Sequence, residues 1–434
     1  MMNTNTHTLR GLSILLFLTT IGVNAQVTRQ PYLQDLTPTS VVIRWQTGVL
    51  TPGKVFCGQL VSSLTRNIIE PNGGGIYHEV TVDSLTPGTK YYYSVTSATK
   101  GSEDQYFITS PKPGTVKPLR IWVISDFGQT SSSQNDKRLA TVAQWKAFNN
   151  NSYHSDFMLS LGDQTQDDAI YQLQHNFFNQ IENVVKMSPL FTAIGNHDYH
   201  DSIYNYKRTF TVPVHGEAGG VPSGTKQYYS FDYSNVHIVV LCTEIEDAAG
   251  YKTQTEWLKK DLENNRQEWL IACMHRPFHS GGHHKSDTDE SMIRNRKNWL
   301  TLLEDHGVDL VLQGHNHVYE RSYLIDNLIG PTTTYTEANN KSTKLGREDV
   351  DGAYKKKKNT PHQGTIFLTS FAGGVAQEDW VKYPIFPIGF SKYEWIGSLV
   401  IDVNGDRMDV KSLCNVPNEK GSHIWDYFTI IKTN

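Results

Sequence analysis

The sequence predicts two domains in series: an all-β sandwich, then an α/β domain with a mixed pair of sheets covered by helices. Residues 26 to about 112 contain short β-rich runs separated by turn signals. From Leu119 onward, apolar strand-like runs alternate with helical patterns, as in βαβ units. Pro111, Pro113 and Pro118 mark a stiff linker between the two parts. We therefore expect domains over 26–114 and 115–434, after a leader over 1–25.

The leader is expected to be a secretory signal. Arg10 precedes the apolar stretch LSILLFLTTIGV, and Val23-Asn24-Ala25 offers a cleavage site before Gln26. That stretch is too short for a membrane span, and no other run approaches one. We expect an exported protein, periplasmic or secreted, without a membrane span.

Composition narrows the class of partner. The formal net charge of −4 becomes about −5 (−4 − 1) when Arg10 leaves with the leader, so bulk charge indicates neither nucleic acid nor an anionic membrane as a partner. Four cysteines are too few for a disulfide framework. The basic run Lys355–Lys358 is expected to be an exposed loop tip, with phosphate steering as the alternative.

In the first domain, the strands are expected at VVIRW (41–45), IYHEVTV (76–82) and KYYYSVTS (90–97). The stretch from Leu85 to Val95 resembles the corner of a fibronectin type III sandwich, where a Tyr near a strand start ties back to upstream backbone. A plain hairpin is the alternative.

In the second domain, the apolar runs and the 3.6-residue patterns give the elements in order. We expect helices over 135–149, 170–185, 253–265 and 291–305. Strands are expected at IWVIS, FMLSL, LFTAI, WLIAC and VDLVLQ, with a hairpin of QYYSFDY and VHIVVLC. The tail is expected to be mostly β, through GTIFLTSF, SLVIDV, RMDVKSL and YFTIIK.

Five polar clusters follow five of these strands. They are Asp126-Phe127-Gly128, Gly162-Asp163, Gly195-Asn196-His197-Asp198, Met274-His275-Arg276-Pro277 and Gly314-His315-Asn316-His317. Each cluster alone is compatible with a turn, because Asp bonds its own backbone and Gly accepts positive φ. In open α/β sheets, however, ligands bind just beyond the carboxyl ends of the strands. The set therefore predicts one site at this edge.

The residue types indicate a two-metal centre. Its candidate ligands are Asp126, Asp163, Asn196, His275, His315 and His317. Two metals about 3.5–4 Å apart need a bridging carboxylate, and Asp163 is the natural bridge. Asp126 and His317 could hold one ion, and Asn196, His275 and His315 the other. Imidazole, carboxylate and amide ligands suit Fe, Zn or Mn, so we expect Fe paired with Zn, Mn or a second Fe.

Such a centre predicts hydrolysis of a small phosphorylated substrate. Two cations clamp phosphate oxygens and lower the pKa of a bound water, whose hydroxide attacks phosphorus. The leaving group then needs an acid, and His197, His283 and His284 are the candidates. Asp198 is expected to orient the ligands rather than to bind metal.

With these clusters in view, the chain resembles the purple acid phosphatases of the calcineurin-like metallophosphoesterase superfamily. The opening Gln30-Pro31-Tyr32-Leu33, Arg44-Trp45, all five clusters and the late Gly373-Gly374 carry the resemblance. It implies a four-layer α/β/β/α catalytic domain after a fibronectin type III-like domain. It also implies Asp126, Asp163 and His317 at the first metal, and Asp163, Asn196, His275 and His315 at the second. His197 and one of His283 or His284 would contact phosphate.

One position departs from the family pattern. Gln166 stands where the family has the Tyr whose phenolate binds ferric iron, and Gly128 stands where many non-purple relatives have His. Gln166, Asp167, Asp168 or water could complete the first metal site.

Three hypotheses follow for the function. The first is an exported dinuclear-metal phosphomonoesterase. The second is a phosphodiesterase or pyrophosphate-bond hydrolase with the same metal centre, decided by the loops near 130–136, 200–225 and 279–290. The third is a binding protein with an impaired centre, which the missing Tyr motivates.

Overall fold

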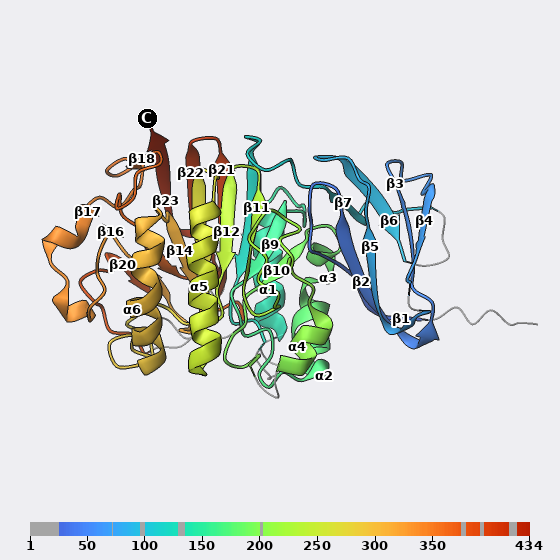
Figure 1. Ribbon diagram of the computed structural model, residues 1–434, viewed down its shortest axis with the longest axis horizontal. Coiled ribbons are helices and arrows are strands. Elements are labelled where there is room, and N and C mark those ends of the chain that lie inside the picture. Colours follow the sequence, from blue (N-terminus) through green and yellow to red (C-terminus); the bar gives the residue numbers. More distant parts are fainter. Residues whose placement is uncertain are drawn as a thin grey trace, which may run out of the picture.

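A computed structural model describes residues 26–71, 73–95, 100–128, 135–199, 203–374, 379–390, 395–415 and 423–434. The predicted leader lies outside these residues. Figure 1 shows two parts side by side, a β sandwich in blue and a larger domain in green to red. None of the described helices combines the length and apolar character needed to cross a membrane.

The first part is an antiparallel sandwich of a three-stranded and a four-stranded sheet. The former has the order β1-β2-β5, with β1 Val27–Gln34, β2 Val41–Thr51 and β5 Gly75–Val82. The latter has the order β4-β3-β6-β7, with β3 Lys54–Gly58, β4 Arg66–Ile69, β6 Lys90–Ser94 and β7 Tyr106–Ile108. The predicted corner tie is present, because the Thr86 N–H donates to the Tyr91 hydroxyl at 3.0 Å.

The second part contains two seven-stranded mixed sheets. One has the order β10-β9-β8-β21-β22-β23-β18, with β8 Leu119–Ile124, β9 Phe157–Ser160, β10 Leu190–Thr192, β18 Tyr354–Lys357, β21 Gly397–Asn404, β22 Arg407–Cys414 and β23 His423–Thr433. The other has the order β11-β12-β13-β14-β19-β15-β20, with β11 Tyr229–Tyr233, β12 Val236–Val240, β13 Trp269–Cys273, β14 Leu310–Gln313, β15 Tyr319–Arg321, β19 Ile366–Thr369 and β20 Ile388–Phe390. A small sheet pairs β16 Leu324–Ile325 with β17 Asn340–Ser342.

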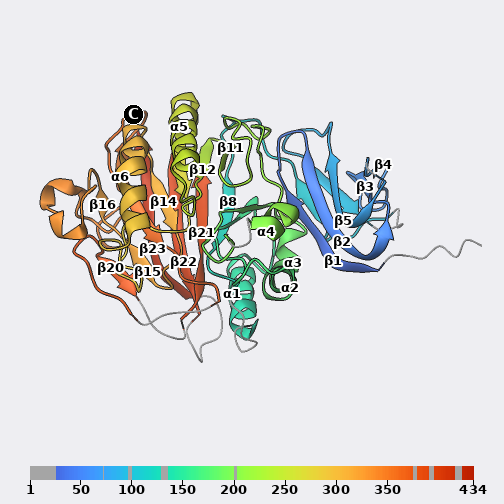
Figure 2. The same ribbon diagram turned by 60° about the horizontal axis from the view of Figure 1, so that its bottom comes forward.

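Helices cover the outer face of each sheet. The helices are α1 Asn135–Phe148, α2 Ile170–Gln172, α3 Asn179–Val185, α4 Tyr204–Thr209, α5 Ala248–Asn264 and α6 Glu290–Asp305, with short 3-10 turns at Thr332–Thr334 and Glu337–Asn339. Figures 1 and 2 show α5 and α6 side by side over the sheet of β12 and β14, while α1 lies by the other sheet. The predicted four-layer α/β/β/α arrangement behind an all-β domain is therefore confirmed.

The period of two along the strands explains this layering. In β8, Ile121 and Val123 belong to the buried cluster between the sheets, whereas Trp122 and Ile124 belong to the cluster under the helices. The Trp122 indole stacks on Trp145 of α1, with ring centroids 5.6 Å apart. A strand buried on both faces reads as a continuous apolar run, which is how the sequence presents it.

Three sequence predictions need correction. Helix α5 starts at Ala248 rather than 253, because the Asp247 side chain caps it by accepting the Gly250 N–H at 2.7 Å. The helix expected over 170–185 is divided by a π-helical stretch, Leu173–Phe178. The Lys355–Lys358 run is no loop tip, since its first three residues lie in β18 and Lys356 is buried against Asp309 at 2.7 Å.

The two parts share a polar interface next to the site loops. Arg44 of the sandwich donates to Thr211 Oγ1 at 2.6 Å and to the Arg208 carbonyl at 2.5 Å. Tyr32 donates to the Thr209 carbonyl at 2.8 Å. The sandwich thus holds the end of α4, whose first turn contacts the loop after Asp163.

Candidate metal centre

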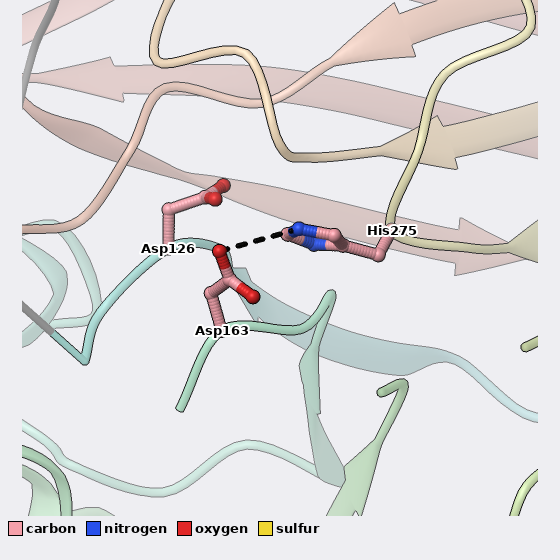
Figure 3. Close-up of side chains that lie close together, drawn as sticks. All are labelled: Asp126, Asp163 and His275. Atoms are coloured by element: carbon pink, nitrogen blue, oxygen red, sulfur yellow. Dashed lines mark ion pairs between the residues drawn. The ribbon is translucent and has the colours of Figure 1, made fainter. Parts of the chain in front are cut away.

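The predicted ligands come together where five strands end. Asp126 follows β8, Asp163 follows β9 and Asn196 follows β10, while His275 follows β13 and His315 and His317 follow β14. Figure 3 shows Asp126, Asp163 and His275 pointing toward one another. One possible ligand atom from each of these three lies within 4.8 Å of the other two.

The residues predicted to bind the second metal point possible ligand atoms toward one another. His275 Nε2 lies 3.3 Å from Asp163 Oδ2 and 3.1 Å from Asn196 Oδ1. On its other side, His275 Nδ1 lies 2.9 Å from the Leu161 carbonyl. If Nδ1 carries the proton that this carbonyl accepts, Nε2 presents a lone pair toward two oxygen acceptors. A cation between these three atoms would satisfy all of them.

Each aspartate keeps one oxygen for the centre. The Asp126 Oδ2 accepts the Ser125 hydroxyl and the His315 N–H, at 2.5 and 3.1 Å. Its Oδ1 faces His317 Nε2 at 3.5 Å and has no hydrogen-bond partner among the described residues. Asp163 Oδ1 accepts the His197 N–H at 3.0 Å, which leaves Oδ2 toward His275. Buried polar atoms are normally paired, so the orphaned Asp126 Oδ1 fits a metal ligand.

The strand ends take up unusual backbone to place these groups. Asp126, Asp163 and His315 all have positive φ, at 51°, 53° and 69°. Such conformations are costly for residues with a Cβ and cluster at functional sites. Two glycines make room: a Cβ on Gly195 would lie 2.0 Å from Asp163 Oδ1, and one on Gly162 would lie 2.5 Å from His275 Nδ1.

The acids and histidines of the cluster shift one another's pKa values. Burial alone would raise the pKa of Asp126, but the facing His317 and His275 lower it to about 2. Burial alone would lower the pKa of His275, but Asp163 raises it to about 10. Burial and the positive neighbours His275 and Arg276 hold the pKa of His315 well below its usual range. A metal ion that binds here must displace the His275 proton.

Asp198 joins the two loops that carry Asp163 and Asn196. Its carboxylate accepts the Gly195 N–H and the Thr165 N–H, each at 3.0 Å. Burial and the nearby Asp163 raise its pKa well above the usual range for a carboxyl. The carboxylate therefore ties the loop after β9 to the loop after β10.

The three candidate acids are placed differently. The His197 ring lies against Gln166, with Nδ1 2.9 Å from the Gln166 carbonyl and 2.8 Å from its Nε2. His284 stacks on His315, with ring centroids 4.2 Å apart. His283 is half exposed, and its Nδ1 lies 3.4 Å from Asp379. Of the two adjacent histidines, His284 is the one that contacts the centre.

Two residues that position candidate site residues were not predicted from the sequence. Asn316 clamps the His284 loop, since its Oδ1 accepts the His284 N–H at 2.9 Å and its Nδ2 donates to the His284 carbonyl at 2.8 Å. Arg276 Nη1 lies 3.4 Å from His315 Nε2. Both belong to the polar clusters that follow strands and stand directly beside a candidate ligand, so their place in the sequence indicates that they lie near the centre.

Comparisons with known proteins match both parts of the chain to family models. Residues 119–319 match the calcineurin-like phosphoesterase family, and residues 29–110 match the purple acid phosphatase N-terminal domain. The chain therefore contains a calcineurin-like phosphoesterase domain, preceded by a purple acid phosphatase N-terminal domain. It is a metal-dependent phosphoric ester hydrolase, similar to acid phosphatases.

Individual relatives support the family at modest identity. Acid phosphatase type 7 of Homo sapiens is 29% identical over 318 residues, which cover 67% of this chain and 69% of the relative. The Fe(3+)-Zn(2+) purple acid phosphatase 12 of Arabidopsis thaliana is 28% identical over 265 residues, which cover 58% of this chain and 54% of the relative. The structure of purple acid phosphatase PPD1 from yellow lupin seeds has a TM-score of 0.69 at 18% identity, covers 94% of this chain and 75% of its own, and shows the shared fold.

Gln166, which stands where the resemblance implies a Tyr, and the nearby Asp167 and Asp168 all contact other parts of the chain. Gln166 Nε2 contacts His197, as described above. Both oxygens of Asp168 accept backbone N–H groups of α4, from Asn205 and Tyr206, at 3.0 Å. Asp167 is exposed and accepts the Gln172 amide at 3.0 Å. Both oxygens of Asp168 are therefore used by α4.

Gln166 leads us to predict the colour of the iron-loaded protein. Protein loaded with ferric iron is expected to show no phenolate-to-iron charge-transfer band, because Gln166 supplies no phenolate. Visible absorption spectroscopy of the oxidised, iron-loaded protein checks this, with Gln166→Tyr as the matched variant that should gain the band. A purple colour in the unaltered protein would mean that another tyrosinate binds the iron.

Proposed function

We propose that this enzyme is an exported phosphomonoesterase with two metal ions. Asp126, Asp163 and His317 would hold one ion, and Asp163, Asn196, His275 and His315 the other. The observation that supports this assignment is the convergence of Nε2 of His275 with oxygens of Asp163 and Asn196, at 3.3 and 3.1 Å. Since one relative carries Fe(3+) and Zn(2+) in its name, we propose iron with zinc as the first pair to test.

The chain's own residues would then perform the remaining steps. When bound, the two metals supply Lewis acidity for the phosphate oxygens and lower the pKa of water toward neutrality. His197, held by Gln166, would give a proton to the leaving oxygen. His284, stacked on His315, would contact the phosphate. We propose small phosphorylated molecules as the substrates, as expected for a phosphoesterase domain.

Metal analysis combined with substrate comparison tests the proposal. The purified protein should bind two metal ions per chain, and chelation should abolish the hydrolysis of p-nitrophenyl phosphate until metal is returned. Turnover of this monoester should exceed that of bis(p-nitrophenyl) phosphate. A folded protein that binds no metal, or that prefers the diester, would overturn the proposal.

A further inference from the structure

A polar cleft lies directly beside the centre. It has a volume of about 610 Å³ and opens between the loop after β12 and the first turn of α6. Arg276 forms the wall toward the centre, because its Nη1 lies 3.4 Å from His315 Nε2. A group attached to a phosphate at the centre has this space next to it. We call it the Arg276 cleft.

The Arg276 guanidinium is fixed by two acids of the cleft. Its Nε donates to Glu244 at 2.9 and 3.0 Å, and its Nη1 lies 3.6 Å from Asp289. Asp289 is itself held, since its Oδ1 accepts the Ser291 N–H at 3.0 Å at the start of α6. The positive charge of Arg276 is therefore paired with carboxylates of the cleft wall.

The remaining charge of the cleft is negative. Four carboxylates line it, those of Glu244, Glu246, Asp289 and Glu290, against the guanidinium groups of Arg276 and Arg294, a formal sum of −2 (2 − 4). Arg294 donates to the Ile245 carbonyl at 3.0 Å and lies over the Tyr251 ring. Glu246 and Glu290 are exposed and carry the excess. Like charges brought into such a cleft repel.

The cleft also continues away from the centre. A second cavity of about 360 Å³ lies between α5 and α6 and shares Glu246 and Arg294 with the first. Ala248 and Tyr251 add apolar surface there, and the Tyr251 ring stacks on Trp299, with centroids 4.9 Å apart. A leaving group longer than a few atoms therefore has a path along the two helices.

We propose that the Arg276 cleft receives the leaving group, and that Glu246 and Glu290 select phosphomonoesters whose leaving group is neutral or carries an ammonium over phosphoanhydrides, such as ATP, whose leaving group carries further phosphate. This inference rests on the proposed phosphomonoesterase function, because it assigns the neighbouring space to the same substrate.

Three probes and one double variant test the inference. We would measure kcat/KM of the metal-loaded enzyme for p-nitrophenyl phosphate, O-phosphoethanolamine and ATP. In Glu246→Gln/Glu290→Gln, the ratio of ATP to p-nitrophenyl phosphate should rise roughly tenfold, because repulsion of the charged leaving group is removed. The ratio of O-phosphoethanolamine to p-nitrophenyl phosphate should fall, and both changes should shrink at high salt.

Glu263→Gln is the matched control, since Glu263 is an exposed glutamate of α5 outside both cavities. Its two ratios should equal those of the unaltered enzyme. Hydrolysis of p-nitrophenyl phosphate with unchanged ratios in the double variant would overturn the inference alone. Absence of hydrolysis of all three probes by the metal-loaded, unaltered enzyme would overturn the proposed function and the inference together.

Discussion

Asp163→Asn is expected to slow phosphate ester hydrolysis by roughly 10³-fold or more, because metal-derived stabilisation of several kcal/mol is lost. Asp163 offers Oδ2 to the centre while Oδ1 accepts the His197 N–H. An uncharged amide would no longer balance two cations, so both should bind more weakly. Metal content by elemental analysis and kcat/KM for p-nitrophenyl phosphate measure the two effects.

Glu263→Gln is again the control for this variant. Glu263 is exposed, lies in α5 and pairs with Lys259 of the same helix. Its loss of charge should leave metal content and rate near those of the unaltered enzyme. The thermal unfolding of the β sandwich should be the same in both variants. Two tightly bound metals and a near-normal rate in Asp163→Asn would remove this residue from the bridging role.

His197→Ala is expected to slow hydrolysis by roughly 10²–10⁴-fold if the imidazole protonates the leaving group. Metal content should stay unchanged, because the ring contacts Gln166 and is not assigned as a ligand. The loss should shrink for nitrophenolate, a good leaving group that needs little protonation, and remain large for an alkyl phosphate. Steady-state rates for a series of leaving groups provide the measurement.

Equal losses for good and poor leaving groups would contradict the acid role of His197 and indicate phosphate binding. The adjacent histidines then offer a matched pair. His284→Ala should reduce the rate, since this ring stacks on His315. His283→Ala should have little effect, because this side chain is half exposed and faces Asp379.

The place of the centre could be predicted from the sequence because it follows from strand order. Parallel strands end at one edge of a sheet, so polar residues directly after apolar runs meet there. Asp126 and Asp163 follow the parallel neighbours β8 and β9, and His275 and His315 follow the parallel neighbours β13 and β14. The two sheets pack through one buried cluster that includes Ile121, Ile271 and Leu310, and this packing brings the pairs together.

Features that depend on distant partners could not be predicted in this way. Lys356 is part of a basic run, yet it is buried because β18 pairs with β23 and places it beside Asp309, 47 residues away in the sequence (356 − 309). The engagement of Arg276 with Glu244 likewise joins two separate strand ends. Local composition does not contain such pairings. The start of α5 could not be predicted for another reason. Gly250 lies three residues after the capping Asp247, and glycine disfavours the first turn of a helix.

The left-handed backbone at Asp126, Asp163 and His315 has a consequence for engineering this enzyme. Each of these residues costs about 1–3 kcal/mol relative to a residue that adopts positive φ without strain. A search for thermostable variants would therefore favour glycine at these positions and would remove proposed ligands of the centre in the process. Screens that select only for heat resistance should accumulate stable but inactive proteins. Stabilising changes are better sought at a distance from the strand ends, where rigidity and turnover do not compete.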